Sequence, residues 1–546
     1  MKNKINRKAL ILSLFLLFTQ GAEAVVFEVT TAEEFQAALA TAASNGGDDE
    51  ILLATDYLVG NFYYFAEEPF NISVRTKDGF DQVVLDADRK GFGVYIRGND
   101  REFDVVLKGF EVKNANAKNG GGGVYVSDVS GTVLIDGVQF TDNFGGQGSA
   151  VNCNSCQRVE IVGSLISNNQ GSEILRLRAN SYYLNEVRFS NNHVINNAPF
   201  FNLVSTGSEQ VSKIESSTFS NNITSGYNAF LIALDNDSSL EIKGSKFEEN
   251  SYNATFLSVR GKAGSILIED SIFRNEGARP SQVLRIWDMS AALVSLKRNR
   301  FISPDTYRSQ ISIGEETFKT VENIQFKGNL VFNSYISMSP NTEAVVTQNT
   351  IVGASSYLYV IATENTEVAV VNNIVRDTSE YTEIVLDGFA KSSQLLNNIF
   401  EEVEGFWITD EKNIVGDPAF WDETNANFYL SSNSPAIDAG NNDFIDGDYL
   451  YDLDGNPRIE NDAVDIGAFE RYTGSLHPAD TNGDGAISQN EFEEYNAAWR
   501  TNETWPTAPE AIPVDFVTRA GYLLQKGGAY KNIGVGKPAT WVPIDE

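Results

Sequence analysis

The tetrapeptide FSNN occurs at Phe189–Asn192 and again at Phe219–Asn222, thirty positions apart. Its apolar first residue belongs to a longer series in which one apolar position is followed by short polar or asparagine-rich residues. The twelve members are Phe110, Phe140, Ile166, Phe189, Phe219, Phe247, Phe273, Phe301, Phe326, Ile351, Ile374 and Ile399. They are 23–30 residues apart. A fixed interval of this size predicts a solenoid of similar structural units.

A second pattern recurs at about the same interval as the first. Short runs in which apolar and other residues alternate occur at 124–126, 150–153, 174–178, 200–204, 256–260, 283–287 and 358–362. Alternation with a period of two indicates strands, and strong helical patterns are absent between these runs. The sequence therefore predicts an all-β chain folded as a parallel β-helix of about 12 coils, right-handed by the general preference of such connections.

In this fold the twelve apolar residues of the series face the interior, and the phenylalanines among them stack from coil to coil. Asparagine follows them because it tolerates left-handed backbone and bonds to neighbouring backbone groups, as a turn requires. FSNN is thus interpreted as scaffold without catalytic content.

The first residues are typical of a secretory signal peptide. Lys2, Lys4, Arg7 and Lys8 precede the apolar run 9–18, and Ala22-Glu23-Ala24 has the small-residue pattern of a cleavage site. We expect the mature chain to begin at Val25. No later stretch is long and apolar enough to predict a membrane span.

The formal net charge is −33, and removal of residues 1–24 takes away four positive charges and one negative charge, leaving −36. A surface of this sign repels nucleic-acid phosphates and attracts cations. The only two cysteines, Cys153 and Cys156, cannot staple a chain of 546 residues, so the core must stabilise it. We expect a local disulfide or two buried thiols rather than a redox centre, because no helix follows the C-x-x-C.

The F-x-x-N units resemble the repeats of polymorphic outer-membrane proteins and of pectate-lyase-like β-helices. Further along, NIVGDPAF (413–420), NSPAIDAGNN (433–442), DLDGNPRI (452–459) and VDIGAFE (464–470) resemble the choice-of-anchor Q proteins, which are secreted β-helices. The resemblance covers about residues 25–472. It implies the right-handed fold and export, but no reaction.

Both ends of the rod need covering, because open strand edges invite association. Thr31 and Glu34 form the pattern of a capping box before an amphipathic helix, which predicts an N-terminal cap. At the other end, an aspartate-rich loop is expected to wrap the last coil, and its carboxylates either form turns, the preferred interpretation, or hold a calcium ion. The loop contains Asp443, Asp446, Asp448, Asp452 and Asp454.

Beyond the rod, DTNGDGAISQNE at 480–491 has the twelve-residue pattern of an EF-hand calcium loop. Gly485 stands at the sharp bend and Ile487 at the apolar eighth position. The expected ligands are Asp480, Asn482, Asp484, the carbonyl of Ala486, Ser488 and Glu491. Hard oxygen donors at this spacing predict bound Ca²⁺.

The preceding residues 474–479 contain glycine and proline and do not predict an entering helix. A loop followed by one clear helix is similar to dockerin repeats, but a second loop is absent, so structural calcium with an anchoring or docking role is favoured over cohesin binding. A second helix is expected around residues 514–526. Only two histidines, His193 and His477, are present, which disfavours His-based metal sites and Ser-His triads.

The outward side chains of the alternating strands contain five arginines and three aromatic residues, which is unexpected on so acidic a chain. Arginines bind carboxylates bidentately and aromatic faces stack on sugars. The catalytic candidates are Arg176, Arg178, Arg260, Arg285, Tyr95 and Tyr125, and the substrate-binding candidates are Arg97, Asn152, Asn154, Asn202 and Trp287. Alternatively, these arginines pair with carboxylates on adjacent coils.

Two functions stay open. One is a secreted or surface-held protein that binds acidic polysaccharide and, if it is an enzyme, cleaves uronate-containing glycan as a lyase. The other is a non-catalytic adhesin or matrix protein. The predicted organisation is a signal peptide at 1–24, a cap at 25–60, the β-helix at 61–430, a closing segment at 431–472 and a calcium module at 473–546.

Overall fold

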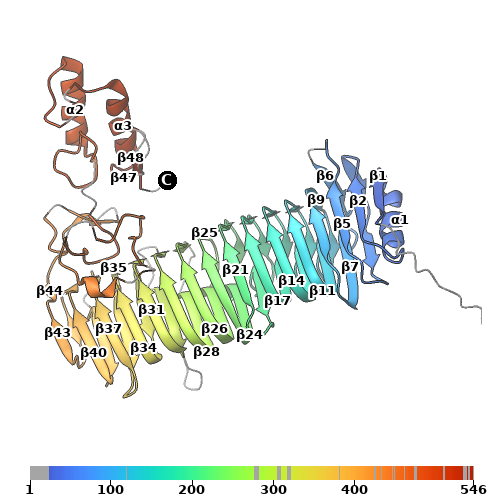
Figure 1. Cartoon of the computed structure of the whole chain (residues 1–546), viewed down its shortest axis with the longest axis horizontal. Helices are drawn as coiled ribbons and strands as arrows, with labels where there is room; N and C mark the ends of the chain where they lie inside the picture. Colours follow the sequence, from blue (N-terminus) through green and yellow to red (C-terminus); the bar gives the residue numbers. More distant parts are fainter. Residues whose placement is uncertain are drawn as a thin grey trace, which may run out of the picture.

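The structure is a computed structural model. It describes residues 24–80, 82–118, 120–275, 282–303, 309–315, 321–379, 381–423, 426–431, 433–445, 447, 449–459, 462–471, 476–507, 509, 511–532, 538 and 541–544. The predicted signal peptide lies outside the described residues, apart from Ala24. Parallel strands stack along one rod, and a small helical module stands beside its C-terminal part (Figure 1).

Three parallel sheets form the sides of the rod. Sheet A contains β1 (Val26–Val29), β2 (Asp49–Leu53), β4 (Phe62–Phe65), β5 (Ile72–Thr76), β7 (Val94–Arg101), β8 (Val105–Lys108), β11 (Val124–Asp136), β14 (Val151–Val162), β17 (Leu175–Asn185), β20 (Phe201–Ser205), β21 (Val211–Glu215), β24 (Asn228–Lys243), β26 (Thr255–Glu269), β28 (Gln282–Lys297), β30 (Ser309–Glu315), β31 (Val321–Lys327), β33 (Ser334–Met338), β34 (Pro340–Thr347), β36 (Leu358–Ala362), β37 (Glu367–Val371), β39 (Ile384–Gly388), β40 (Ser392–Leu396), β42 (Val403–Glu404) and β43 (Thr409–Glu411).

Sheet B takes one strand from each turn. It contains β3 (Tyr57–Val59), β6 (Val83–Asp86), β9 (Phe110–Lys113), β12 (Gln139–Thr141), β15 (Leu165–Ser167), β18 (Arg188–Ser190), β22 (Thr218–Ser220), β25 (Lys246–Asn250), β27 (Ile272–Asn275), β29 (Arg300–Ile302), β32 (Leu330–Phe332), β35 (Thr350–Gly353), β38 (Ile374–Asp377), β41 (Ile399–Phe400) and β44 (Ile414–Val415). The short sheet C contains β10 (Asn116–Ala117), β13 (Phe144–Gly145), β16 (Gln170–Gly171), β19 (His193–Val194) and β23 (Ile223–Thr224).

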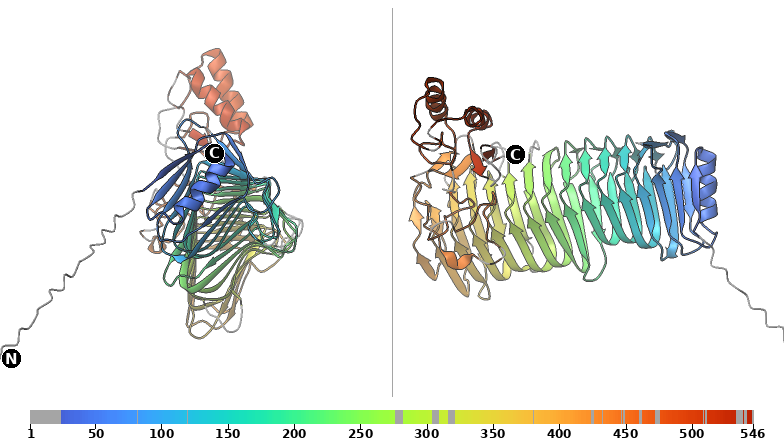
Figure 2. Two further views of the ribbon diagram at one scale, coloured as in Figure 1. Left: turned by 90° about the vertical axis from the view of Figure 1, so that its right-hand side faces the viewer. Right: turned by 45° about the horizontal axis from the view of Figure 1, so that its top comes forward.

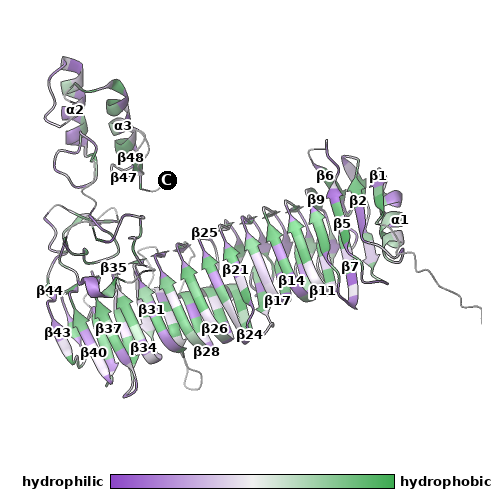
Figure 3. Ribbon diagram, in the orientation of Figure 1, coloured by the Kyte–Doolittle hydropathy of each residue, from purple (hydrophilic) through white to green (hydrophobic). Residues whose placement is uncertain are grey.

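The interior is formed by the alternate residues of these strands. Hydrophobic residues recur from strand to strand along the rod (Figure 3). The predicted phenylalanine stack is confirmed between residues 189 and 301. Phe219 and Phe247 have ring centroids 4.7 Å apart, Phe247 and Phe273 5.0 Å, and Phe273 and Phe301 5.1 Å. Each of these rings is buried, so the repeat seen in the sequence is the core of the rod.

The two asparagines of FSNN have different roles. The third residue of each unit, Asn191 or Asn221, takes positive φ at the turn (55° and 56°). The fourth residue, Asn222, is buried, and its side chain accepts a hydrogen bond from Asn192 N (2.9 Å) and donates one to Phe189 O (3.1 Å). It therefore joins three successive turns, because its amide also donates to Asn250 Oδ1 (2.8 Å).

These contacts repeat as two ladders of buried asparagines. The first ladder contains Asn143, Asn169, Asn192, Asn222 and Asn250. The second, before the strands of sheet B, contains Asn299, Asn329, Asn349, Asn373, Asn398 and Asn413. The backbone groups at the corners of the rod are thus satisfied by side chains, as buried polar groups require.

Three positions of the predicted series are wrong. Phe326 lies in β31 of sheet A, and the residue opposite Phe301 is Val331. Ile374 and Ile399 pair with each other but face outward, because Val375 is the residue that pairs with Ile351. A shift of one residue in a strand reverses its face.

One further pairing and the number of turns also differ from the prediction. Phe140 pairs with Val112 rather than with Phe110, which is on the same face two residues earlier. Within the described ranges sheet B has fifteen strands, corresponding to about 14 turns, where the sequence predicted about 12. Turns at β3 and β6 were missed because they present Leu58 and Leu85 instead of an aromatic residue, and the turn at β44 was missed as well, where Ile414 lies opposite Ile399 on the outer face.

Helix α1 (Ala32–Ala42) covers the N-terminal end of the rod (Figures 1 and 2). The predicted capping box is present, since Thr31 Oγ1 accepts from Glu34 N and the Glu34 side chain accepts from Thr31 N. Phe35 packs on Phe62 with ring centroids 4.5 Å apart. Strands β1, β2 and β3 already belong to the sheets, so the rod begins inside the segment expected to be only a cap.

In its described residues, the closing segment covers one flank of the rod instead of wrapping the last coil. It packs on the outer face of sheet B, where Ile466, Ala468 and Phe469 cover Ile374 and Ile399. The hairpin β45 (Phe420–Asp422) and β46 (Asn427–Leu430) and the 3₁₀ helix η2 (Asn442–Phe444) belong to the same region. The outward isoleucines left by the shifted register explain this position, since they offer the apolar surface that the segment buries.

The aspartate-rich loop has structural roles at its described residues. Asp452 is buried and accepts hydrogen bonds from the backbone of Asp454, Asn456 and Glu470. Asp454 pairs with Arg300 at 2.5 Å. Asp446 and Asp448 lie outside the described residues. These contacts agree with the turn-forming interpretation of the loop.

The C-terminal module has its own core. Helices α2 (Gln489–Thr501) and α3 (Val514–Gln525) pack together with the hairpin β47 (Tyr530–Asn532) and β48 (Trp541–Pro543). Tyr495, Leu523 and Trp541 are buried between them, and His477 is buried beside Trp541 at a ring distance of 4.7 Å. No helix of the described chain has the length and apolar character needed to cross a membrane.

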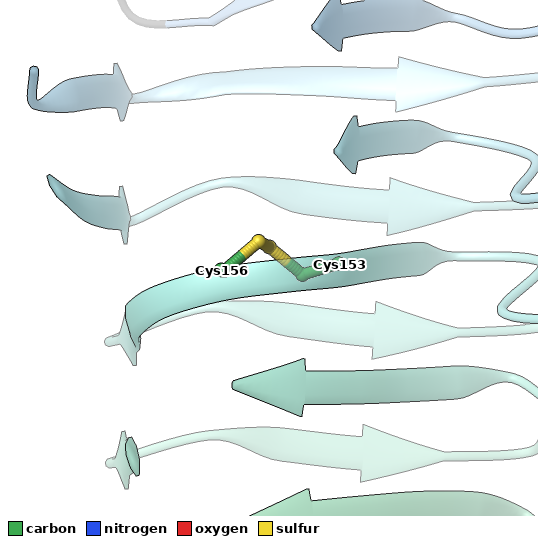
Figure 4. The surroundings of a disulfide bond; sticks show 2 residues. All are labelled: Cys153 and Cys156. Atoms are coloured by element: carbon green, nitrogen blue, oxygen red, sulfur yellow. A yellow bond between two sulfur atoms is a disulfide. The ribbon is translucent and has the colours of Figure 1, made fainter. Parts of the chain in front are cut away.

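Cys153 and Cys156 form a disulfide within β14 (Figure 4). Both residues are buried in the core of the rod, and Ser155 between them takes positive φ (59°). The local disulfide is one of the two predicted alternatives, and the positive φ of Ser155 lets two side chains three positions apart in one strand meet on the same side.

Candidate functional site

The outward-facing candidate residues lie in two adjacent rows on sheet A, called here the polar face. The first row contains Tyr63, Tyr95, Tyr125, Asn152, Arg176, Asn202, Leu231, Ser258, Arg285 and Ser312. The second contains Phe65, Arg97, Ser127, Asn154, Arg178, Val204, Ala233, Arg260 and Trp287. Each residue lies opposite the next one in its row on the neighbouring strand. No register shift occurs between the two rows, so they stay side by side along the sheet.

The predicted alternation is confirmed. Val94, Val124, Leu175, Leu257 and Leu284 are all buried in the core. Each is followed by a residue of the first row, because successive side chains of a strand point to opposite faces.

Three residues of the first row, Asn152, Ser258 and Ser312, are nevertheless buried. Asn152 is 4% exposed, and its side-chain amide donates to Gln147 O (2.9 Å). Ser258 is fully buried and accepts from Trp287 Nε1 (2.9 Å). Asn152 lies under the turn around Gly148, and Ser258 lies under the indole. The predicted role of Asn152 in contacting substrate is therefore corrected to support of this turn.

An aromatic cluster occupies the N-terminal end of the polar face. Tyr95 and Tyr125 are stacked, with ring centroids 5.0 Å apart and an interplanar angle of 18°. Phe92 lies 5.2 Å from Tyr95 and 5.5 Å from Tyr125, and Phe65 lies 5.5 Å from Tyr95. Phe65 is 48% exposed. Flat rings in partial contact with solvent are suited to stacking on a sugar ring.

The arginines beside this cluster differ in their partners. Arg97 lies 3.8 Å from Asp128, and Arg176 lies 2.9 Å from Glu173, which also accepts from Asn202. Arg178 is exposed, and among the residues that the structure describes no carboxylate forms an ion pair with it. The structure thus supports ion pairing for two arginines and leaves Arg178 oriented to solvent.

A second cluster surrounds Trp287 in the middle of the rod. The guanidinium of Arg285 lies 4.5 Å from the centre of the indole ring, and that of Arg260 lies 6.0 Å from it. Both contacts are within the range of cation–π attraction. The side chains of this cluster therefore hold one another in place on the polar face.

The two clusters are too far apart to act on one bond. Tyr125 in β11 and Arg260 in β26 are separated by five strand-to-strand steps, or about 24 Å at the usual spacing of paired strands. The catalytic candidates proposed from the sequence therefore do not form one active site. Spacing over several turns is compatible with contacts to several residues of one linear chain.

Burial raises the pKa of Tyr125 above its ordinary value, and the neighbouring Tyr95 and Asp128 raise it further. The hydroxyl is thus protonated at neutral pH and can donate a hydrogen bond. A general base should have a pKa near the working pH, so Tyr125 is better suited to binding than to proton abstraction.

The loop at 480–491 folds around Asp480. Asp480 Oδ1 accepts from Gly483 N (2.8 Å) and Asp484 N (3.2 Å), and Oδ2 accepts from Gly485 N (2.9 Å). Gly485 takes φ of 80°, as a sharp bend at this position requires. Asn482 donates to Asp484 (2.8 Å).

At the end of the loop, Ser488 and Glu491 form the capping box of α2. Glu491 also accepts from Thr481 N (2.9 Å) and Asn482 N (3.2 Å). Burial, together with the charges of Asp484 and Glu491, raises the pKa of Asp480 to about 6. Within the described part of the chain, no three His, Cys, Asp or Glu side chains converge on a common point suited to a metal ion.

Sequence reasoning missed Phe65 and Phe92 of the aromatic cluster, and also Tyr63 beside it, whose ring centroid lies 6.3 Å from that of Tyr95. The repeat was recognised only from Phe110 onward, so the strand at 62–65 was not placed next to the strand at 94–101. The run of four aromatic residues at 62–65, which is typical of a strand, is the signal that would have found it. Glu173 was missed because it precedes its strand.

The comparisons with known proteins concern the fold. The family model described as "Right handed beta helix region" matches residues 230–400, and the rod is accordingly a right-handed parallel β-solenoid. No curated protein matches the sequence. Among solved structures, the chain is similar to the crystal structure of pectate lyase Pel9A, with 14% identity, 83% of this chain and 98% of that chain covered, and a TM-score of 0.31. A likeness of this degree carries no argument, and the right-handed β-helix rests on the family model.

Proposed function

We propose that this protein is a secreted or surface-held β-helix that binds acidic polysaccharide along the polar face of sheet A. The observation that carries the proposal is the stacked Tyr95–Tyr125 pair with Arg97, Arg176 and Arg178 in the neighbouring turns. Aromatic faces contact sugar rings, and guanidinium groups bind carboxylates. On a chain with a net charge of −33, such a row of arginines selects an anionic ligand.

Export rests on the signal-peptide pattern at 1–24 and on the motifs that resemble choice-of-anchor Q proteins. The disulfide between Cys153 and Cys156 is the kind of bond that persists outside the cytosol. These features support an extracellular or cell-surface location.

The C-terminal module is proposed to bind one Ca²⁺ at residues 480–491 and to act in anchoring or docking. The oxygen donors fit calcium chemistry, and the mutual influence of Asp480, Asp484 and Glu491 on the pKa of Asp480 is the repulsion that a cation would relieve. The ligands would be Asp480, Asn482, Asp484, Ala486 through its carbonyl, Ser488 and Glu491.

The alternative is a non-catalytic adhesin or matrix protein. It is favoured by the ion pairs of Arg97 with Asp128 and of Arg176 with Glu173, which give these arginines a structural role. If the protein is an enzyme, a lyase for uronate-containing glycan fits the arginines best, since they would neutralise the uronate carboxylate.

A glycan array tests the binding proposal, followed by titration of the best acidic glycan against the Arg178→Gln and Tyr125→Ala variants. Both variants should bind at least tenfold more weakly. Arg188→Gln is the matched control, because Arg188 is an exposed arginine on a strand of sheet B. An ultraviolet assay for unsaturated uronate products then separates a lyase from a binding protein. Unchanged binding by both variants would overturn the proposal for the polar face.

A further inference from the structure

A cleft of about 840 Å³ lies on the other side of the rod, away from the polar face. Its floor is the outer face of sheet B at β25, β27, β29 and β32. The hairpin β45–β46, which precedes the closing segment, forms one wall, and the C-terminal module forms the other with Lys526, Gly527 and Ala529. Three parts of the chain that are distant in sequence thus enclose one cleft, which is a frequent position for ligand sites.

The charge of this cleft is opposite to that of the molecule. Lys246, Arg274, Arg300 and Lys526 line it, and Glu248 is the one carboxylate among the lining residues that the structure describes. Arg300 is balanced by Asp454, 2.5 Å away, so the excess of positive charge comes from the lysines and Arg274. Glu248 lies 3.9 Å from Arg274, at the limit of an ion pair. Since the chain as a whole has a net charge of −33, this local excess of positive charge favours an anionic ligand.

Aromatic rings complete the lining. Tyr429 and Phe469 have ring centroids 4.6 Å apart, and the guanidinium of Arg300 lies 5.7 Å from the centre of the Phe469 ring. Trp421 is half-buried and reaches the module, since a Cβ at Gly528 would lie 3.2 Å from its ring. Rings beside cationic side chains provide apolar contact together with recognition of charge.

The floor limits how a ligand can bind. β25, β27 and β29 are paired on both sides within sheet B, so their backbone groups are already used. A peptide therefore finds no free strand edge to extend, which is the usual way in which an extended peptide binds a sheet. The ligand must be held by side chains, through carboxylates and flat apolar faces.

We propose that this cleft is a second binding site and that its ligand is an acidic oligosaccharide. Lys246, Arg274 and Lys526 bind its carboxylates, and Trp421 and Tyr429 contact its ring faces. The site is on a different sheet from the polar face and does not depend on it, although both would take ligands of the same class.

The test is calorimetric titration of the full chain with a uronate hexasaccharide. The double variant Lys246→Gln/Arg274→Gln should lose one class of sites or bind there at least tenfold more weakly. Lys526→Gln, an exposed residue of the module, should weaken the same sites and serves if the double variant fails to fold. Arg188→Gln is the control for loss of an exposed arginine elsewhere on sheet B.

The polar-face variant Arg178→Gln separates this proposal from the first. If only the cleft binds, the wild type shows one class of binding sites, and the Arg178→Gln variant binds the hexasaccharide as the wild type does. If only the polar face binds, the double variant and Lys526→Gln match the wild type, which overturns the cleft. Absence of uronate binding by the wild type, or tighter binding of a glutamate hexapeptide than of the hexasaccharide, also overturns it.

Discussion

Tyr530 donates a hydrogen bond of 2.7 Å to Asp480, joining the hairpin β47–β48 to the first residue of the loop fifty positions earlier. The same two segments are paired through their backbones, because Ile487 N donates to Gly528 O (2.9 Å) and Tyr530 N donates to Gly485 O (3.1 Å). The loop therefore has two supports, its exit helix α2 and this strand. A change in the loop should therefore alter the stability of both helix α2 and the hairpin β47–β48.

Glu491→Gln should abolish calcium uptake by the module. Asp480, Asp484 and Glu491 concentrate negative charge in one small loop, so a cation should bind there and stabilise the folded module in proportion to its excess over the dissociation constant. Titration calorimetry of the full chain and proteolysis around residues 476–532 with and without calcium are the measurements. Glu493→Gln, on the exposed side of α2, is the control and should bind as the wild type does. Equal calcium binding by the Glu491→Gln protein would contradict the assignment.

Phe219→Ala should destabilise the rod by about 3–5 kcal/mol, because it leaves a cavity in a buried stack. The ring of Phe219 contacts Phe247 at 4.7 Å and Phe201 and Phe230 at 5.6 Å each. Chemical denaturation followed by circular dichroism measures the change. Phe389→Ala, where the ring is 74% exposed, should have an effect within about 0.5 kcal/mol. Similar effects of the two substitutions would mean that the stack does not stabilise the fold.

Asn222→Ala should cost at least about 2 kcal/mol, since it leaves the buried Asn192 N and Phe189 O without their partner. Its neighbour provides a contrast within the same tetrapeptide. Asn221→Gly should be close to neutral, because Asn221 is exposed and glycine readily adopts its φ of 56°. The same denaturation experiment compares them, and equal losses at 221 and 222 would argue against the ladder.

The closing segment should become more stable as the pH falls from neutral. Burial raises the pKa of Asp465 to about 6, above the ordinary value of 3.8. The folded state therefore binds the proton more tightly, and the segment gains stability below pH 6 and loses it as the pH rises through 6. Glu470, whose carboxylate accepts from Asp465 N, and Arg458, 3.3 Å from Glu470, are its ionisable neighbours.

Hydrogen exchange of peptides from 436–471 at two pH values, corrected for intrinsic rates, measures this effect. Asp465→Asn should reduce the dependence, and its single amide oxygen keeps an acceptor for only one of Asp438 N and Arg471 N. Asp142→Asn, at an exposed turn with φ of 54°, should leave it unchanged. A protection that increases with pH in the wild type would show that the carboxylate is stabilised in its charged form.

The repeat was readable from the sequence because every turn places a residue of the same kind in the same surroundings. Phe189, Phe219, Phe247, Phe273 and Phe301 are equivalent in space, and the sequence predicted this. The prediction failed where a turn has no distinctive residue, as at Leu58, and where two apolar neighbours compete, as at Ile374 and Val375. Which of two adjacent apolar residues faces inward depends on the covering segment, and that contact is with residues far along the chain.

The candidate site was predictable in part for the same reason. Alternation within a strand indicates which residues face outward, so the two rows of the polar face could be listed. Their partners could not, because the contact between Arg176 and Glu173 and the burial of Asn152 depend on turns between strands. The cleft on sheet B was not predictable, since Lys246 and Lys526 line the same cleft only because of the position of the module.

The asparagine ladders give the rod an unusual freedom of length. Each ladder asparagine bonds in the same way to the asparagines of the turn before and the turn after it. A turn bounded by two ladder asparagines therefore presents the same hydrogen-bonding groups on its two faces along the rod. Removal or duplication of one whole turn, such as residues 193–222, would leave equivalent surfaces to join. Evolution can therefore change the reach of this molecule in whole-turn increments, while α1 at one end and the covered flank of sheet B at the other stay as they are.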